Sequence, residues 1–392
     1  MDVGKFLIEF LKSTGIAKVF EGTGWMNLAM IIIGLVFLYL AIKKDFEPYL
    51  LIPISFGIIL VNLLPEIYIT YNEAGEVVSR GLLGYLHLGV ECELYPCLIF
   101  LGIGATTDFG PLIANKKTML LGAAAQIGIF VAFFLALAFG FNFFEAGSIG
   151  IIGGADGPTA ILTSNRLLAL SSNPTSKDLL APIALAAYSY MALVPVIFPP
   201  IIRLFTTKKE RLIKMEQLRE VSKKEKILFP IVCTIIVSVI VPSATPLIGC
   251  LMLGNLIKES GVVPNLSNTV GNALLYICTI LLGLSVGATA NGTTFLTWST
   301  IKIFILGISA FIIAAIFGLL GGKVMNALSH GKVNPMIGAA GVSAVPMAAR
   351  VVQKEGQKED PSNFLLMHAM GPNVAGVIGS AIAAGILLTI FG

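Results

Sequence analysis

The sequence is poor in charged side chains, because Asp, Glu, Lys and Arg make up only 12% of its 392 residues. Soluble globular domains carry about 25%. Hydrophobic residues reach 56%, and the mean hydropathy is +0.89. This composition excludes an ordinary soluble domain. Apolar stretches such as 119–144 and 303–320 are long enough for helices that cross a hydrocarbon core, and alternating amphipathic strands of a membrane barrel are absent.

The sequence also lacks most signatures of catalytic, nucleotide and metal chemistry. It has no GxxxxGK[ST] loop for ATP, no convincing GxGxxG after a strand and no nucleophile elbow. The three histidines form no HExxH group, and the five cysteines form no CxxC pair. We expect the cysteines to be buried small apolar residues. Energy for uphill transport must then come from an ion gradient or from chemistry performed with another chain.

These features predict an all-α polytopic membrane protein with about 10–12 transmembrane segments. The segment Arg203–Lys226 carries nine Lys or Arg against four Asp or Glu, and the positive-inside rule places it in the cytoplasm. We interpret it as a topology anchor rather than a nucleic-acid or lipid patch. Residues Met1–Phe20 resemble an interfacial amphipathic helix and show no signal-peptide cleavage site. The expected divisions are 1–24, 25–205, the basic loop 206–226, and 227–392.

The second half of the chain repeats features of the first half. Pro53 and Asn62 are nine residues apart, as are Pro246 and Asn255. Two further pairs of short segments match, with offsets of 183 and 185 against 193 for the first pair: 104–106 with 287–289, and 152–155 with 337–340. We therefore expect two structural repeats, inverted relative to each other, each with a broken helix. In transporters of this kind the two breaks face each other near the bilayer midplane.

The stretch Ile151–Ile161 places the carboxyl group of Asp156 among glycines and a proline inside an apolar region. A carboxylate at membrane depth costs about 2.5–3.5 kcal/mol on insertion scales and usually marks an ion path or proton relay. Gly and Pro interrupt helical hydrogen bonding and free carbonyl groups for other partners. The alternative is a solvated Asp in a loop at a helix end. We interpret Asp156 as the centre of a cation site.

The second broken segment and the last span of each half supply other candidate groups. Asn334, Gly338 and Ser343 offer oxygens that suit a hard monovalent cation. Arg350 is either a bidentate ligand for an anionic substrate group or a topology charge. The last spans align to place Tyr190 opposite Asn373, as a proton relay and a polar site residue, although Tyr190 is alternatively an interfacial aromatic. Two glutamates in another span are expected to line a vestibule or to sit at an interface: Glu91 and Glu93.

Four segments together carry a resemblance to a known family, from about Trp25 to the end of the chain. They are Gly104–Pro111, Gly153–Thr159, Tyr188–Pro195 and Gly371–Ser380. Their sequences resemble those of the β subunit of the sodium-pumping biotin-dependent decarboxylases, the family of the oxaloacetate, methylmalonyl-CoA, glutaconyl-CoA and malonate enzymes.

The resemblance implies a subunit of the cell (inner) membrane that decarboxylates carboxybiotin and couples this reaction to Na⁺ export. The biotin carrier is implied to lie on another chain, because this chain lacks the Met-Lys-Met sequence that usually holds biotin. The implied partners are a carboxyltransferase α subunit and a small membrane γ subunit, with the β subunit as a trimer and no nucleic acid. The family's site residues correspond to Asp156, Tyr190, Asn334, Gly338, Ser343, Arg350 and Asn373. A sodium/proton antiporter or a sodium-coupled organic-anion transporter remains the alternative.

Overall fold

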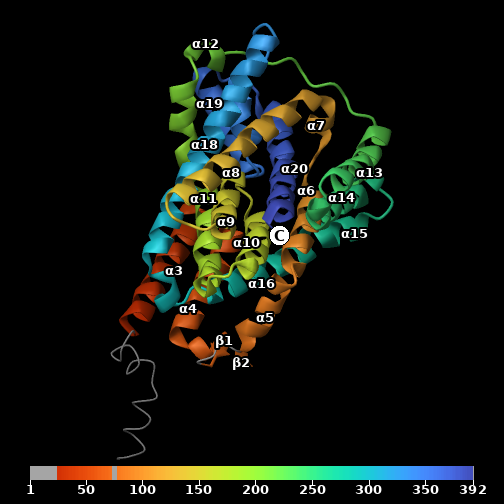
Figure 1. Ribbon diagram of the computed structural model, residues 1–392. Coiled ribbons are helices and arrows are strands. Elements are labelled where there is room, and N and C mark those ends of the chain that lie inside the picture. Colours follow the sequence, from red (N-terminus) through yellow and green to blue (C-terminus); the bar gives the residue numbers. More distant parts are fainter. Residues whose placement is uncertain (1–23, 73–76, 392) are drawn as a thin grey trace, which may run out of the picture.

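The computed structural model describes residues 24–72 and 77–391, and these residues fold almost entirely as helices (Figure 1). The expected amphipathic segment Met1–Phe20 lies outside the described residues. The elements of the first half are α3 (Gly24–Lys44), α4 (Pro48–Leu63), η1 (Pro65–Ile67), β1 (Ile69–Tyr71), β2 (Val77–Arg80), α5 (Leu82–Glu91), α6 (Leu94–Thr106), α7 (Gly110–Ala114), η2 (Lys116–Thr118), α8 (Met119–Ala138), α9 (Phe143–Gly150), η3 (Ile151–Gly154), α10 (Gly157–Leu170), η4 (Pro174–Leu179) and α11 (Leu180–Phe205).

The second half follows a basic loop that holds one short helix, α12 (Lys208–Arg211). Its further elements are α13 (Lys223–Ile240), η5 (Pro242–Ala244), α14 (Thr245–Ser260), α15 (Pro264–Thr269), the π-helical turn η6 (Val270–Leu274), α16 (Leu275–Ala288), α17 (Gly292–Phe295), α18 (Trp298–Leu328), η7 (Pro335–Gly341), α19 (Met347–Glu359) and α20 (Leu366–Phe391). The two short strands pair antiparallel, with Ile69 opposite Arg80.

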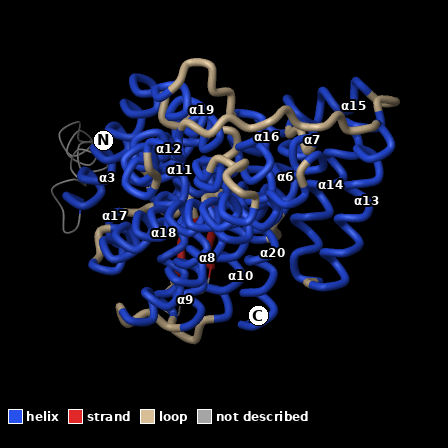
Figure 2. The backbone as a smooth tube through the Cα atoms, turned by 90° about the horizontal axis from the view of Figure 1, so that it is seen from above, coloured by secondary structure: helices blue, strands red, loops and turns tan. Residues whose placement is uncertain are grey.

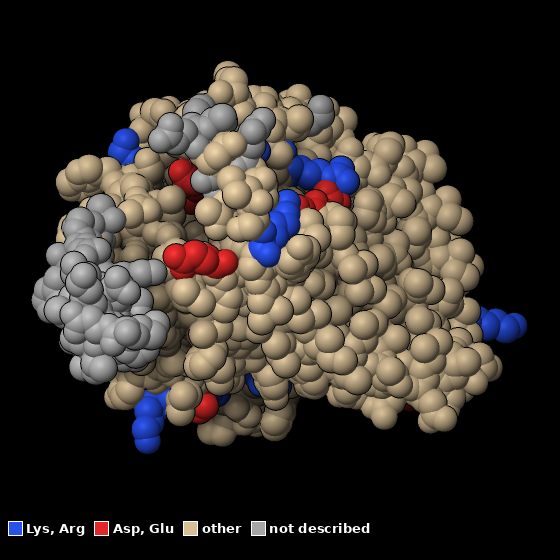
Figure 3. Space-filling model, turned by 90° about the horizontal axis from the view of Figure 1, so that it is seen from below, with Lys and Arg blue, Asp and Glu red and all other residues tan. Residues whose placement is uncertain are grey.

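Six helices of the described chain are long and apolar enough to cross a membrane, and α5 and α6 form a further pair bent by 66°. The long helices are α3, η2–α8, η4–α11, α15–α16, α18 and α20. Large uncharged areas cover the molecule when it is viewed from below (Figure 3). The expected all-α polytopic architecture is confirmed, whereas several of the expected segments are shorter helices such as Pro48–Leu63.

Two expectations about local structure need correction. The span expected over 119–144 ends at Ala138, because Gly140 takes a positive φ of 91° and a new helix begins at Phe143 after a capping box at Asn142. The cysteines are not all buried as expected. Of the cysteines, only Cys278 is buried; Cys92 is exposed and the other three are half-buried.

Helices from the two halves pack closely against each other. In sequence order the contacts are α4 with α16, α6 with α14, and α8 with α18. Glycine permits the close crossing of α6 and α14. A Cβ atom on Gly104 of α6 would lie 1.9 Å from the Leu251 carbonyl oxygen, and one on Gly254 of α14 would lie 1.9 Å from the Leu101 carbonyl oxygen. In the view from above, α13–α15 and α3 lie at opposite edges, with α8, α10 and α20 between them (Figure 2).

Each half contains a segment that enters the helix bundle and turns back. Asn142 and Ser171, at the start of α9 and the end of α10, are joined by a hydrogen bond of 3.2 Å, so both ends of this hairpin lie together. Asn334 and Asn363, which flank η7 and α19, donate to the same two carbonyl groups of the basic loop, those of Arg211 and Ile213. These matched hairpins support the prediction of two inverted repeats, which stays a prediction.

Candidate cation site

The tips of the two hairpins meet at Asp156. The backbone N–H of Ser343 donates to the Gly154 carbonyl over 3.1 Å, and the Ser343 hydroxyl donates to Asp156 Oδ2 over 3.2 Å. Ala155, between Gly154 and Asp156, has a left-handed backbone with φ 56°. That turn ends η3 and sets Asp156 as the N-cap of α10, where its Oδ1 accepts from the Thr159 N–H over 3.4 Å.

The carboxyl group of Asp156 is buried, with 5% of the residue exposed, and its side-chain partners are hydroxyl groups. Ser380 of α20 donates to Oδ2 over 2.8 Å, in addition to Ser343. Within the described residues, no Lys, Arg or His forms an ion pair with Asp156. Isolated charges are costly away from water, so a carboxyl in this setting either carries a proton or binds a cation. The arrangement therefore suits exchange of H⁺ for a small cation.

Gln126 of α8 is a further residue at this site. It is 5% exposed, and its Nε2 donates to the Gly376 carbonyl over 3.2 Å, while its Oε1 has no hydrogen-bond partner within residues 24–72 and 77–391. A Cβ atom on Gly154 would lie 3.5 Å from Gln126 Oε1 and 3.1 Å from Ser380 Cβ. An unpaired amide oxygen in a buried position needs an explanation, and a bound cation or water provides one. In the sequence, the signal for Gln126 is a single amide side chain inside an apolar span.

Asn373 is fully buried and fastens the second hairpin tip to α20. Its Nδ2 donates to the carbonyl groups of Ala340 (3.0 Å) and Val342 (2.7 Å), directly before Ser343. Its Oδ1 has no hydrogen-bond partner in the described chain. Asn373 thus lies where the sequence analysis expected a site residue, and it offers one free oxygen while holding the tip in place.

The other expected residues lie away from Asp156 or have different partners. Tyr190 donates its hydroxyl to the Phe304 carbonyl of α18 over 2.6 Å. Asn334 holds the basic loop, as described above, and Gly338 allows close contact with the backbone of α18. The side chain of Arg350 is exposed on α19 and makes no hydrogen bond or ion pair with any described residue. The structure therefore brings together Asp156, Ser343 and Asn373, but not these four.

Tyr188, two residues before Tyr190, is the tyrosine beside Asp156. It is 1% exposed, and a Cβ atom on Gly157 would lie 1.9 Å from its ring atom Cε1. The ring therefore lies directly on the backbone next to Asp156. Its hydroxyl has no hydrogen-bond partner in the part of the chain that the structure describes. Alignment of the two halves predicts Tyr190 instead, because it does not show which side of α11 faces α10.

The basic loop is tied to α19 and the residues that follow it by ion pairs. Arg211 pairs with Glu359 at 2.7 Å, and Lys214 pairs with Asp360 at 2.8 Å. The hydrogen bond from Lys214, together with bonds from Ser362, lowers the pKa of Asp360 to about 2. The outer end of the second hairpin is therefore fixed to the loop that precedes α13.

The described residues contain no group of three or more His, Cys, Asp or Glu side chains that could hold a metal ion. The Asp156 carboxyl has two serine hydroxyls as side-chain partners, and the unpaired amide oxygen of Gln126 lies near the neighbouring Gly154. Multivalent ions usually require several anionic ligands. A site with one carboxylate and neutral oxygens fits a monovalent cation.

A family model described as "Na+-transporting oxaloacetate decarboxylase beta subunit" matches residues 26–391. Methylmalonyl-CoA decarboxylase subunit beta of Propionigenium modestum is 56% identical, over 98% of this chain and 99% of the relative. Glutaconyl-CoA decarboxylase subunit beta of Acidaminococcus fermentans is 54% identical, over 94% of each chain. A probable oxaloacetate decarboxylase beta chain of Vibrio cholerae is 48% identical, over 93% of this chain and 95% of the relative. With a match over nearly its whole length, this chain belongs to the family of Na⁺-transporting decarboxylase β subunits.

Proposed function

We propose that this chain is the multi-pass membrane subunit that couples decarboxylation of carboxybiotin to export of Na⁺, with Asp156 as the exchange site for Na⁺ and H⁺. The single observation that carries the proposal is the buried Asp156 carboxyl, which has hydroxyl partners and no cationic partner at the junction of two broken helices. Membership of the family supports the reaction class and does not favour the antiporter or symporter alternative.

Carboxybiotin is supplied by a carrier on a partner chain, and loss of CO₂ leaves the bonding electron pair on the ureido nitrogen, which takes up one proton. Asp156 holds that proton before the reaction. Sodium arriving from the cytoplasm displaces it, and the hydroxyl groups of Ser343 and Ser380 then stabilise the carboxylate. Sodium leaves on the other side, and the site returns to the protonated state. The proton is thus consumed on the cytoplasmic side.

Arg350 is the candidate for recognising the carboxylated carrier. Its guanidinium is exposed in the first turn of α19 and has no partner within the described chain, so it is available for two parallel hydrogen bonds to a carboxylate. A β-subunit trimer, a carboxyltransferase α subunit and a small γ subunit complete the proposed assembly. The soluble partner selects the acyl substrate.

The test is sodium uptake into inverted membrane vesicles that hold this chain with its partners, started by carboxylated biotin carrier. We expect uptake to require both the carrier and Asp156, so that Asp156→Asn abolishes it. Asp45→Asn is the matched control, because Asp45 is exposed in the loop between α3 and α4 and its positive φ of 53° is readily adopted by Asn. Uptake driven by a pH gradient alone, without any need for the carrier, would identify an antiporter and contradict the proposal.

A further inference from the structure

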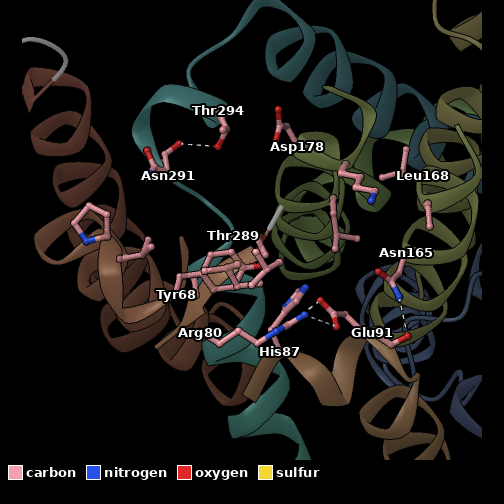
Figure 4. A pocket seen from close by; sticks show the side chains of 18 of the residues that line it. Tyr68, Arg80, His87, Glu91, Asn165, Leu168, Asp178, Thr289, Asn291 and Thr294 are labelled. Carbon is pink, nitrogen blue, oxygen red and sulfur yellow. Dashed lines mark hydrogen bonds and ion pairs between the residues drawn. The ribbon is translucent and has the colours of Figure 1, made fainter. Parts of the chain in front are cut away.

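A cavity of about 610 Å³ lies at the end of α10 that is remote from Asp156 (Figure 4). Residues from β2, α5, α10, η4 and α17 line it. Its polar lining is Tyr68, Arg80, His87, Glu91, Asn165, Lys177, Asp178, Thr289, Asn291, Thr293 and Thr294. The two carboxyl groups balance the two cationic groups, and the rest are mainly neutral oxygens and amides. Such a lining lets a small cation enter without holding it tightly.

The cavity lies on the side opposite to the basic loop. Lys177, Asp178 and Leu180 line it at the start of α11, and the basic loop follows the other end of the same helix at Phe205. A helix of 26 residues is about 39 Å long, which exceeds the thickness of a hydrocarbon core. If the basic loop is cytoplasmic, the cavity therefore faces the outside.

The floor of the cavity is separated from Asp156 by one buried layer, which holds apolar side chains together with Thr159, Thr163 and Ser164 of α10. Asn165, which lines the cavity, donates to the Val90 and Glu91 carbonyl groups over 3.3 Å each. From Asp156 to Asn165 the chain advances nine residues, about 14 Å of helix. Between these two levels lie four side chains of one buried cluster, each at most 2% exposed: Val90, Ile161, Leu185 and Tyr188.

Unpaired polar groups lie at both ends of this layer, and Thr159 Oγ1 and Thr163 Oγ1 within it also have no hydrogen-bond partner among the described residues. The Tyr188 hydroxyl lies beside Gly157 at the level of Asp156 and, as noted above, has no hydrogen-bond partner in the described chain. His87 lines the cavity, is only 5% exposed, and its Nδ1 also has no partner among the described residues. Buried polar groups are normally satisfied, so unpaired ones along this buried layer indicate places where water or an ion is received.

We propose that this cavity is the outward release vestibule for Na⁺, and that Tyr188 and its apolar neighbours form the seal between it and Asp156. The inference rests on the sodium site proposed above. In the conformation described here the seal is closed, because the Tyr188 ring lies on the Gly157 backbone. Release then requires that ring to leave α10. Sodium then passes the Tyr188 hydroxyl, reaches Asn165 and leaves between Glu91 and Asp178.

The vestibule is tested with two glutamates that lie two residues apart and each pair with an arginine. Glu91 pairs with Arg80 at 3.3 Å and lines the cavity, whereas Glu93 pairs with Arg166 and does not. Both are changed to Gln in the complete complex, reconstituted with the carrier-binding face outward. The initial decarboxylation rate is then measured against Na⁺ concentration inside the liposomes, where released Na⁺ accumulates and inhibits.

We expect Glu91→Gln to raise the luminal Na⁺ concentration for half-inhibition about two- to threefold, the effect of one unit charge acting over roughly 14 Å in a partly aqueous medium. Glu93→Gln leaves that concentration unchanged, and neither variant alters the external Na⁺ concentration for half-maximal activity. Equal luminal values for wild type and Glu91→Gln would overturn the vestibule. A wild-type complex whose uptake needs no carrier would instead show that the proposed function itself is wrong.

The seal is tested by passive Na⁺ efflux from the same liposomes without carrier. Tyr188→Ala opens the layer and is expected to speed efflux at least tenfold, while Tyr188→Phe keeps the ring and stays as tight as wild type. If Tyr188→Ala fails to assemble by size exclusion, Ile161→Ala opens the same layer. Assembled Tyr188→Ala or Ile161→Ala complexes that remain as tight as wild type would refute the seal.

Discussion

Ser380 donates the shortest of the side-chain hydrogen bonds to Asp156, and its removal tests how the carboxylate is stabilised. Its Oγ lies 2.8 Å from Asp156 Oδ2, and the residue is fully buried. A hydrogen bond to a charged group contributes about 1.5–3 kcal/mol. Each 1.4 kcal/mol corresponds to about a tenfold change in a binding constant. Because sodium binds the anionic carboxylate, Ser380→Ala should weaken sodium binding about 10- to 100-fold.

The assay is the Na⁺ concentration for half-maximal decarboxylation by the reconstituted complex. Ser285→Ala is the matched control, because Ser285 is also fully buried but donates to the Leu281 carbonyl within its own helix over 2.7 Å. Ser343→Ala, which removes a longer bond of 3.2 Å, should have an intermediate effect. Equal half-saturating concentrations for Ser380→Ala and Ser285→Ala would refute the reasoning.

The same variant also has an expected pH dependence. Protons and sodium compete for the same carboxyl group in the proposed mechanism, and loss of the Ser380 hydroxyl removes a partner of the anionic form only. The increase in half-saturating Na⁺ concentration that Ser380→Ala causes should therefore become smaller as the pH is raised, because fewer protons compete with Na⁺. A defect of constant size between pH 6 and 9, about three orders of magnitude in proton concentration, would show that Ser380 acts in some other way.

Three further predictions concern residues at increasing distance from Asp156. Gln126→Leu removes an unpaired amide oxygen and should raise the half-saturating Na⁺ concentration severalfold, in the assay just described. Tyr190→Phe removes one donor to the Phe304 carbonyl, so a thermal shift corresponding to about 1 kcal/mol is expected with little change in sodium affinity. The pKa of Asp360 is lowered by Lys214, so this pairing stabilises the fold above the unfolded value near 3.8 and is lost as the pH falls through about 2. The difference in unfolding temperature between wild type and Asp360→Asn should therefore be constant above about pH 5 and vanish at the acid end; a difference that persists there would contradict it.

The centre of the site was predictable from sequence because its chemistry conflicts with its surroundings. Asp156 is an acidic residue inside a Gly/Pro-interrupted apolar stretch, and Ser343 and Asn373 lie in the matching segments of the second half. Acidic and polar residues are costly at membrane depth, so they can be recognised in an apolar segment from the sequence alone. The same reasoning predicted the helical architecture, since long apolar runs leave few other solutions.

The choice between Tyr188 and Tyr190 was not predictable, because it depends on the rotation of α11 about its axis. Residues two apart on a helix face different directions, so one tyrosine contacts Gly157 and the other contacts α18. The role of Asn334 depends on a tertiary contact with the basic loop, about 120 residues earlier in the chain. The two glutamates at 91 and 93 differ for the same reason: one faces the cavity and the other faces Arg166.

The pairing of α4 with α16, α6 with α14 and α8 with α18 has a consequence for biogenesis. Each of these three first-half helices finds its main neighbour in a part of the chain that the ribosome makes later. These helices must therefore remain in the lipid without their main neighbours until the segments beyond the basic loop have been inserted. Two separately synthesised fragments, divided within residues 212–222, should be unable to fold alone yet assemble when produced together in one membrane.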